Sequence, residues 1–132
     1  MAEPTHWQTV PLSMSQHVLA PDGSEIRLLA VGERASMVHC RLPAGKTSRA
    51  VVHKTVEELW FVLAGHGLMW RQSGCVEGVD ILAPGCSLSI PTGTVFQFQN
   101  TGPCPLDILI VTTPPWPGDD EAEPRPGLWI PS

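Results

Sequence analysis

Residues 85–100 read GCSLSIPTGTVFQFQN, and they contain the clearest structural signal in the chain. At its centre is a Pro-x-Gly corner, in which Pro91 holds its φ near about −65° and Gly93 is free to adopt a positive φ. A strand that begins after this corner places Phe96 and Phe98 on one face, because alternate side chains of a strand point to the same side. The stretch therefore predicts two strands joined by a sharp corner.

Short strands separated by turn residues extend from this corner in both directions. The turn at 32–34, Gly-Glu-Arg, suits a hairpin, and no segment shows the pattern of a helix of three turns. The predicted strands are 26–31, 36–42, 55–63, 68–72, 79–82, 87–90, 95–100 and 106–113. Eight strands at this spacing, in a chain with 12 Gly and 14 Pro, indicate an all-β jelly roll or closed barrel.

The chain divides into an arm, a barrel and a tail. With 132 residues it is long enough for one core. We expect residues 1–24 to form an arm with one edge strand, and residues 25–113 to form the barrel. The tail, 114–132, is rich in proline and acidic residues, so we expect it to add no strand to the barrel. Its apolar residues, Trp116 and 128–130, predict that it packs on the barrel or on a second subunit.

Composition argues against several classes of partner. The formal net charge is −5, from 8 Lys and Arg against 13 Asp and Glu, and no basic stripe indicates nucleic-acid binding. No run approaches the ~18 apolar residues that span a membrane, and the first ten residues do not resemble a secretory signal. We expect a cytoplasmic protein whose four cysteines, which lack close spacing, are reduced.

Residues 85–100 resemble the second conserved motif of the cupin superfamily. Gly85, Pro91, Gly93 and Asn100 stand where that motif has its two glycines, its proline and its asparagine, and Phe96 stands at the position of its histidine. The match lies in the spacing as well as in the residue types.

The first cupin motif is recognisable in the segment that begins at Gly45. Glu58 and Gly65 have the family's spacing and His53 is the available histidine, whereas Val51 or Thr55 replaces the partner histidine. The resemblance covers roughly residues 42–112. It implies a cupin-type double-stranded β-helix, a jelly-roll barrel, and a homodimer, as is common for small cupins.

The resemblance also bears on metal binding. Cupins that match the pattern fully bind a divalent metal through three histidines and one glutamate. Here His53 and Glu58 are the two remaining candidate ligands, and Phe96 places an apolar ring at the third position. The residues that would complete a set are His39, Glu57, His66 and Gln97. We therefore expect that no cofactor is required, with a bound divalent metal as the alternative.

The same residues predict an organic pocket with acid/base groups. His53 and Glu58 are the candidate catalytic pair, within a barrel lined by Trp60, Phe96 and Phe98. The alternative interpretation is structural: His53 is hydrogen-bonded at the barrel mouth, and the aromatic residues pack in the core. Arg71 is a candidate for binding a carboxylate or phosphate of the substrate, although arginines on strands are usually solvated.

Three functions fit these residues. The first is an isomerase, lyase or cyclase that uses His53 and Glu58 for proton transfer on a small polar or aromatic metabolite. The second is a module that binds or senses a small molecule without changing it. The third is a metal-dependent cupin oxygenase or isomerase.

Overall fold

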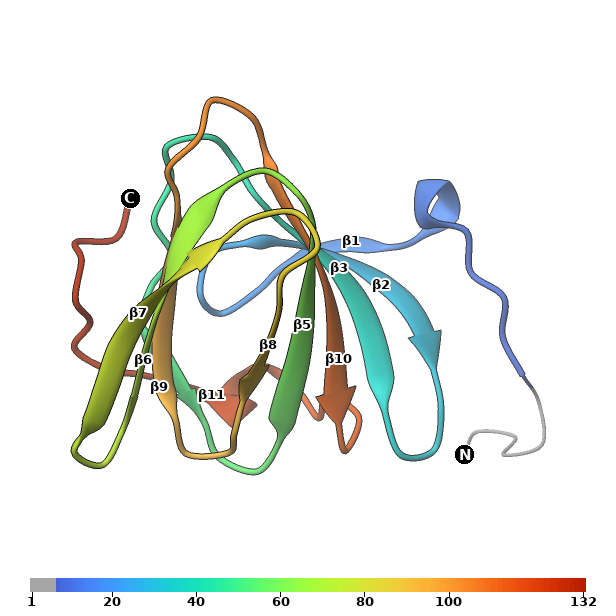
Figure 1. The fold of residues 1–132 in the computed structure, drawn as a ribbon. Coiled ribbons are helices and arrows are strands. Elements are labelled where there is room, and N and C mark those ends of the chain that lie inside the picture. The colour runs from blue at the N-terminus through green and yellow to red at the C-terminus, as the bar shows by residue number, and fades with distance from the viewer. Residues whose placement is uncertain (1–6) are drawn as a thin grey trace.

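Two antiparallel sheets face each other and enclose the core, as a computed structural model of the chain shows for residues 7–132 (Figure 1). One sheet has the order β1-β2-β3-β10-β5-β8 and the other β11-β4-β9-β6-β7. The strands are β1 His17–Leu19, β2 Glu25–Val31, β3 Ser36–Leu42, β4 Val51–His53, β5 Glu57–Ala64, β6 Gly67–Ser73, β7 Val76–Leu82, β8 Ser87–Ile90, β9 Val95–Asn100, β10 Leu106–Thr113 and β11 Ala122–Pro124. Two short 3₁₀ helices, η1 Leu12–Met14 and η2 Asp119–Glu121, complete the described elements. The all-β jelly-roll prediction is confirmed.

The predicted Pro-x-Gly corner joins β8 to β9. Gly93 has a φ of 84°, and the Thr94 N–H donates to the carbonyl of Pro91 at 3.1 Å. The Gly93 N–H donates to the carbonyl of His53 at 3.1 Å. The corner therefore also fixes the end of β4, where His53 lies.

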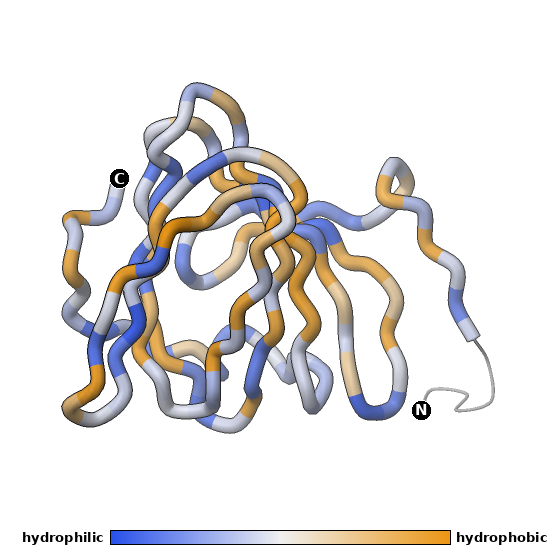
Figure 2. Tube along the Cα trace, viewed as in Figure 1, coloured by the Kyte–Doolittle hydropathy of each residue, from blue (hydrophilic) through white to orange (hydrophobic). Residues whose placement is uncertain are grey.

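The hairpin predicted around 32–34 is formed by β2 and β3, and its turn is hydrophilic (Figure 2). The strand predicted over 55–63 begins later in the structure, because β5 starts at Glu57. A separate strand, β4, ends at His53. Thr55 and Val56 leave the ladder because their backbone N–H groups bind the carboxylate of Glu121 at 2.6 and 2.9 Å. That partner lies far along the chain, so no local pattern indicates it.

Rows of inward-facing side chains cross β3, β10 and β5. The strand register gives three successive rows: Ser36, Thr112 and Glu58; Val38, Ile110 and Trp60; and Cys40, Ile108 and Val62. The first row is polar and the following rows are largely apolar. Beyond them, Met69, Phe98 and Leu106 have no exposed surface and fill one end of the barrel. The polar row marks the other end.

The arm and the tail both contribute strands. The expected edge strand of the arm is β1, which pairs with β2. The expectation that the tail adds no strand is wrong, because β11 pairs with β4. Pro124 is the last residue of β11, which lies at the edge of its sheet. Proline has no backbone N–H, and an edge strand tolerates this because only one of its sides is paired.

The tail is held along its length. Beyond β11, the buried side chain of Gln97 receives a hydrogen bond from the Trp129 N–H at 2.9 Å and donates one to the Trp129 carbonyl at 2.8 Å. Ser132 bonds Thr47 through its backbone N–H and its hydroxyl. The tail therefore packs on its own barrel, one of the two surfaces predicted for it. Separately, none of the helices described in 7–132 has the length and apolar character of a membrane span.

Candidate functional site

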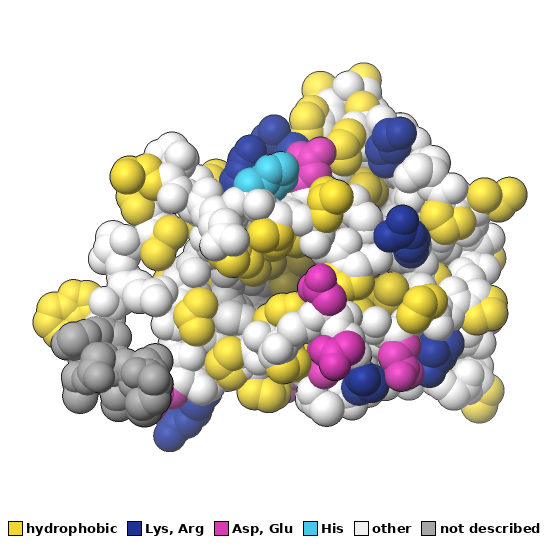
Figure 3. Space-filling view, turned by 180° about the vertical axis from the view of Figure 1, so that it is seen from behind, with side chains coloured by type: hydrophobic (Ala, Val, Ile, Leu, Met, Phe, Trp, Pro, Cys, Tyr) yellow, Lys and Arg dark blue, Asp and Glu magenta, His cyan; other side chains and the backbone are white. Residues whose placement is uncertain are grey.

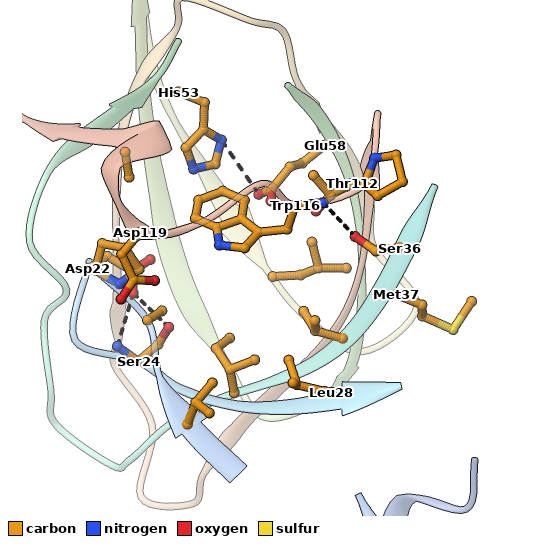
Figure 4. Close-up of a pocket in the computed structure, with 18 of the residues that line it drawn as sticks. Asp22, Ser24, Leu28, Ser36, Met37, His53, Glu58, Thr112, Trp116 and Asp119 are labelled. Carbon is orange, nitrogen blue, oxygen red and sulfur yellow. Dashed lines mark hydrogen bonds and ion pairs between the residues drawn. The ribbon is translucent and has the colours of Figure 1, made fainter. Parts of the chain in front are cut away.

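A cavity of about 280 Å³ lies at the polar end of the barrel. Its lining is mainly apolar and comes from the β1–β2 turn, from β2 to β5, β9 and β10, and from the tail. Figure 3 shows a hollow on the corresponding face, with hydrophobic side chains inside it and acidic side chains beside it. Figure 4 shows His53, Glu58 and Trp116 among the residues around the cavity. The barrel therefore offers room for a small molecule.

Glu58 projects from β5 into this cavity and is 6% exposed. Its Oε1 accepts a hydrogen bond from Trp60 Nε1 at 3.0 Å, and its Oε2 accepts one from Thr112 Oγ1 at 2.8 Å. Burial raises the pKa of Glu58 from 4.5 to about 7, because desolvation penalises the charged form more than the two donors stabilise it. The raised pKa brings the protonation equilibrium of this carboxyl toward neutral pH.

His53 lies at the end of β4 with its Nδ1 4.0 Å from Glu58 Oε1. The residue is 5% exposed, and Nδ1 is buried without a hydrogen-bond partner among the described residues. Burial lowers the pKa of His53, and the nearby Asp22 carboxyl opposes this shift. The ring is thus kept neutral beside a carboxyl group, with one nitrogen free for a new partner.

Aromatic rings form the walls around His53. Phe96 and Trp116 each meet the imidazole edge to face, with centroids 5.2 Å away, and Trp60 meets Phe96 at 5.7 Å. Phe96 comes from β9 and Trp60 from β5. Trp116 comes from the tail, where its backbone N–H donates to Ser36 Oγ at 3.0 Å. These rings restrict water around the imidazole and the carboxyl.

The β1–β2 turn contributes a carboxyl that the sequence did not indicate as functional. Asp22 is 8% exposed, lines the cavity, and accepts hydrogen bonds at Oδ1 from the Ser24 N–H and the Ser24 hydroxyl. Burial raises the pKa of Asp22 despite these bonds. Asp-Gly-Ser reads as an ordinary turn, so the only available signal was an acidic residue beside a predicted barrel strand.

Of the six predicted site residues, four line the cavity and two do not. His53, Glu58, Trp60 and Phe96 come together there. Phe98 packs edge to face on Trp60 at 5.0 Å in the filled end of the barrel. Arg71 pairs with Asp80 and donates to the Ser89 carbonyl at 2.7 Å, beside a separate cavity between β6, β7 and β8.

The donor set of the cavity does not fit a divalent metal. Glu58 and His53 are the two family ligands that remain, and the Phe96 ring packs on His53 where a third ligand would reach in. Across residues 7–132, no group of three or more His, Cys, Asp or Glu side chains is arranged to hold a metal. The residues considered as substitutes lie elsewhere: His39 beside Asp107, Glu57 and His66 exposed, and Gln97 under the tail.

Comparisons with known proteins agree with the fold. The family model described as a cupin domain matches residues 38–112. An uncharacterised protein of Methanocaldococcus jannaschii is 31% identical over 107 residues, which cover 77% of this chain and 82% of that protein. The alginate biosynthesis protein AlgA of Pseudomonas putida is 28% identical over 93 residues, which cover 70% of this chain but 18% of AlgA.

Solved structures show the same architecture. A protein of Bacillus halodurans superposes with a TM-score of 0.65 and 21% identity, over 70% of this chain and 72% of that one. Oxalate decarboxylase of Bacillus subtilis, a protein with Mn(II) centres, superposes with a TM-score of 0.74 and 17% identity, over 87% of this chain and 31% of that enzyme. At these identities the likeness concerns the fold alone.

Proposed function

The chain belongs to the cupin family, and from that premise we propose that it binds a small molecule in the hollow end of its barrel and moves a proton on it with Glu58 and His53. The reaction class is an isomerisation, elimination or cyclisation. The observation that carries the proposal is a buried carboxyl with a pKa raised to about 7, 4.0 Å from an imidazole nitrogen that has no hydrogen-bond partner within residues 7–132.

Glu58 has the properties of a general acid or base. A catalytic group is most effective when its pKa lies near the operating pH, and burial brings Glu58 there. When a bound ligand gives its proton to the carboxylate, Trp60 and Thr112 already hold both oxygens in place. No reorganisation of these two donors is then needed during the transfer.

His53 is suited to complete the proton transfer. Its neutral imidazole can accept a proton or donate one, and the aromatic rings around it limit exchange with water. A ligand that lies beside this pair and contacts both side chains would meet one group that gives a proton and one that takes it. That arrangement moves a proton between two atoms of the same molecule.

Deuterium exchange tests the proposal. 2-Tetralone, a compact aromatic ketone, would be incubated in D₂O, with incorporation at its α-carbons followed by NMR. We expect the protein to accelerate exchange and Glu58→Gln to reduce that acceleration at least about a hundredfold. Glu57→Gln is the matched control, because Glu57 is exposed and adjacent in sequence. Exchange that persists in Glu58→Gln would contradict the role of this carboxyl.

A module that binds its ligand unchanged is the second candidate. It is favoured by the full engagement of Glu58, whose two oxygens already accept hydrogen bonds within the protein. A ligand that raises the melting temperature but is recovered without exchange or conversion would support this candidate.

The expected homodimer stays a prediction. It is supported by the outer face of β5, where Leu59, Phe61 and Leu63 are each more than 40% exposed. Light scattering of the purified protein would test it, and a monomeric mass at micromolar concentration would contradict it.

A further inference from the structure

The cavity has an acidic lining without a basic counterpart. Three carboxyl-bearing residues contribute to it, namely Asp22, Glu58 and Asp119. Within the part of the chain that the structure describes, the lining contains no Lys or Arg, and its single histidine has a lowered pKa. An anionic ligand would therefore enter a site with no cation to pair with, at a high desolvation cost.

Asp22 has an oxygen available for such a ligand. Its Oδ1 accepts two hydrogen bonds from Ser24, at 2.9 and 2.7 Å, whereas Oδ2 accepts none from residues 7–132. Asp119, in η2 of the tail, lies on the same side of the cavity in Figure 4. Arg49 is exposed and donates to the carbonyl of Pro21; its charge opposes the rise in the pKa of Asp22, but no hydrogen bond within residues 7–132 joins it to this oxygen.

A second feature points independently to a ligand. His53 Nδ1 has no hydrogen-bond partner in the described part of the chain, and its side chain is 6% exposed and lines the same cavity. The rings of Phe96 and Trp116 pack on this imidazole and Trp60 packs on Phe96, and aromatic faces attract cations. Acidic groups and aromatic rings together favour a positively charged group on the ligand.

The size of the cavity limits the rest of the ligand. An apolar protein cavity of about 150 Å³ holds benzene, and this one has about 280 Å³. Because the lining is mainly apolar, the body of the ligand must be apolar as well.

We propose that the cavity binds a compact, mainly apolar molecule that carries one basic nitrogen, and that Asp22 Oδ2 accepts the hydrogen bond from this nitrogen. The inference rests on the proposed function, because it assigns a chemical class to the occupant of the same cavity. The ammonium group loses its hydration on entry, and a charge-assisted hydrogen bond to Asp22 offsets that loss.

Three probes with one apolar body test this inference: benzylamine, benzyl alcohol and benzoate. Binding to the full chain would be measured by NMR at neutral pH through the indole N–H signals of Trp60 and Trp116, with Trp7 as an exposed reference. We expect benzylamine to bind about tenfold more tightly than benzyl alcohol, and benzoate to bind most weakly. This comparison uses the unmodified protein, so it does not depend on a variant that folds.

A variant then tests the role of Asp22. We expect Asp22→Asn to weaken the binding of benzylamine about tenfold and to change the affinity for benzyl alcohol by less than about twofold. The side-chain oxygen of Asn can still accept the hydrogen bonds from Ser24. Asp120→Asn is the matched control, because it removes the same charge from an exposed residue outside the cavity lining. An equal effect of the two variants would assign the preference to overall charge and overturn the role of Asp22.

The outcomes separate this inference from the proposed function. If benzyl alcohol or benzoate binds as tightly as benzylamine, as judged from the Trp60 signal, the preference for a basic nitrogen is contradicted. The proposal that the cavity binds a ligand is then still supported. If none of the three probes shifts Trp60 or Trp116, the ligand cavity is contradicted and the inference falls with it.

Discussion

The two ends of this barrel share strands β9 and β10, yet one end is filled and the other is hollow. Inward positions of β3, β10 and β5 begin with the polar row of Ser36, Thr112 and Glu58 and continue with apolar rows. At the filled end Phe98 and Met69 pack without exposed surface. The comparison indicates that the residues chosen at the first row contribute to the cavity, because β3, β10 and β5 keep one register through all three rows.

The filled end should be the more sensitive to loss of an aromatic ring. Phe98→Ala removes a ring packed on Trp60 and is expected to lower the free energy of unfolding by about 3–5 kcal/mol. Phe96→Ala enlarges a cavity that already exists, so we expect roughly half of that loss. Denaturant unfolding of both variants measures the difference. Equal losses would mean that the hollow end is as well packed as the filled one.

The hollow end should show a pH dependence that the filled end lacks. Because the pKa of Glu58 is raised in the folded state, folding takes up a proton between pH 4.5 and about 7, and stability falls as pH rises through this window. The loss is on the order of 3 kcal/mol.

Glu58→Gln removes this titration. The variant should match the wild type near pH 5 and exceed its stability at pH 8, as measured by unfolding at both values. Glu57→Gln, on the exposed side of β5, should leave the pH profile unchanged. A wild-type profile that Glu58→Gln does not alter would show that Glu58 titrates normally.

The tail should stabilise the hollow end through the side chain of Glu121. This buried carboxylate accepts hydrogen bonds from the backbone of Thr55 and Val56 and from the Thr55 hydroxyl. Burial opposes its ionisation, but these bonds prevail and lower its pKa. Glu121→Ala should cost about 2 kcal/mol, since it leaves buried N–H groups unpaired.

Glu123 provides the matched control for Glu121. It also lies in the tail, but its partners Lys54 and Arg125 are surface groups, so Glu123→Ala should change stability by less than about 0.5 kcal/mol. Thermal or denaturant unfolding of both variants tests the contrast. Similar effects of the two substitutions would contradict the anchoring role of Glu121.

The sequence predicted those parts of the fold and site that depend on local pattern. Two-residue alternation and the Pro-x-Gly corner placed the barrel strands, and they placed Glu58, Trp60 and Phe96 on inward faces. The direction of Arg71 was not predictable in the same way, because its guanidinium turns toward Asp80 on a neighbouring strand.

Residues from outside the barrel strands escaped prediction for a different reason. Asp22 comes from a turn, and Trp116 and Asp119 come from the tail. The positions of the two tail residues are tied to the pairing of β11 with β4, which has no signature within the proline-rich segment. Local sequence pattern therefore indicates the part of the site on the barrel strands, and contacts between distant segments complete it.

An NMR pH titration of the Trp60 indole N–H follows the ionisation of Glu58, because this N–H donates to Glu58 Oε1 at 3.0 Å. A midpoint near pH 7 is the predicted result, because burial raises the pKa of Glu58 to about that value. A midpoint near the usual value of 4.5 would contradict the account, since Glu58 would then be a permanently ionised side chain with no capacity to exchange a proton at neutral pH.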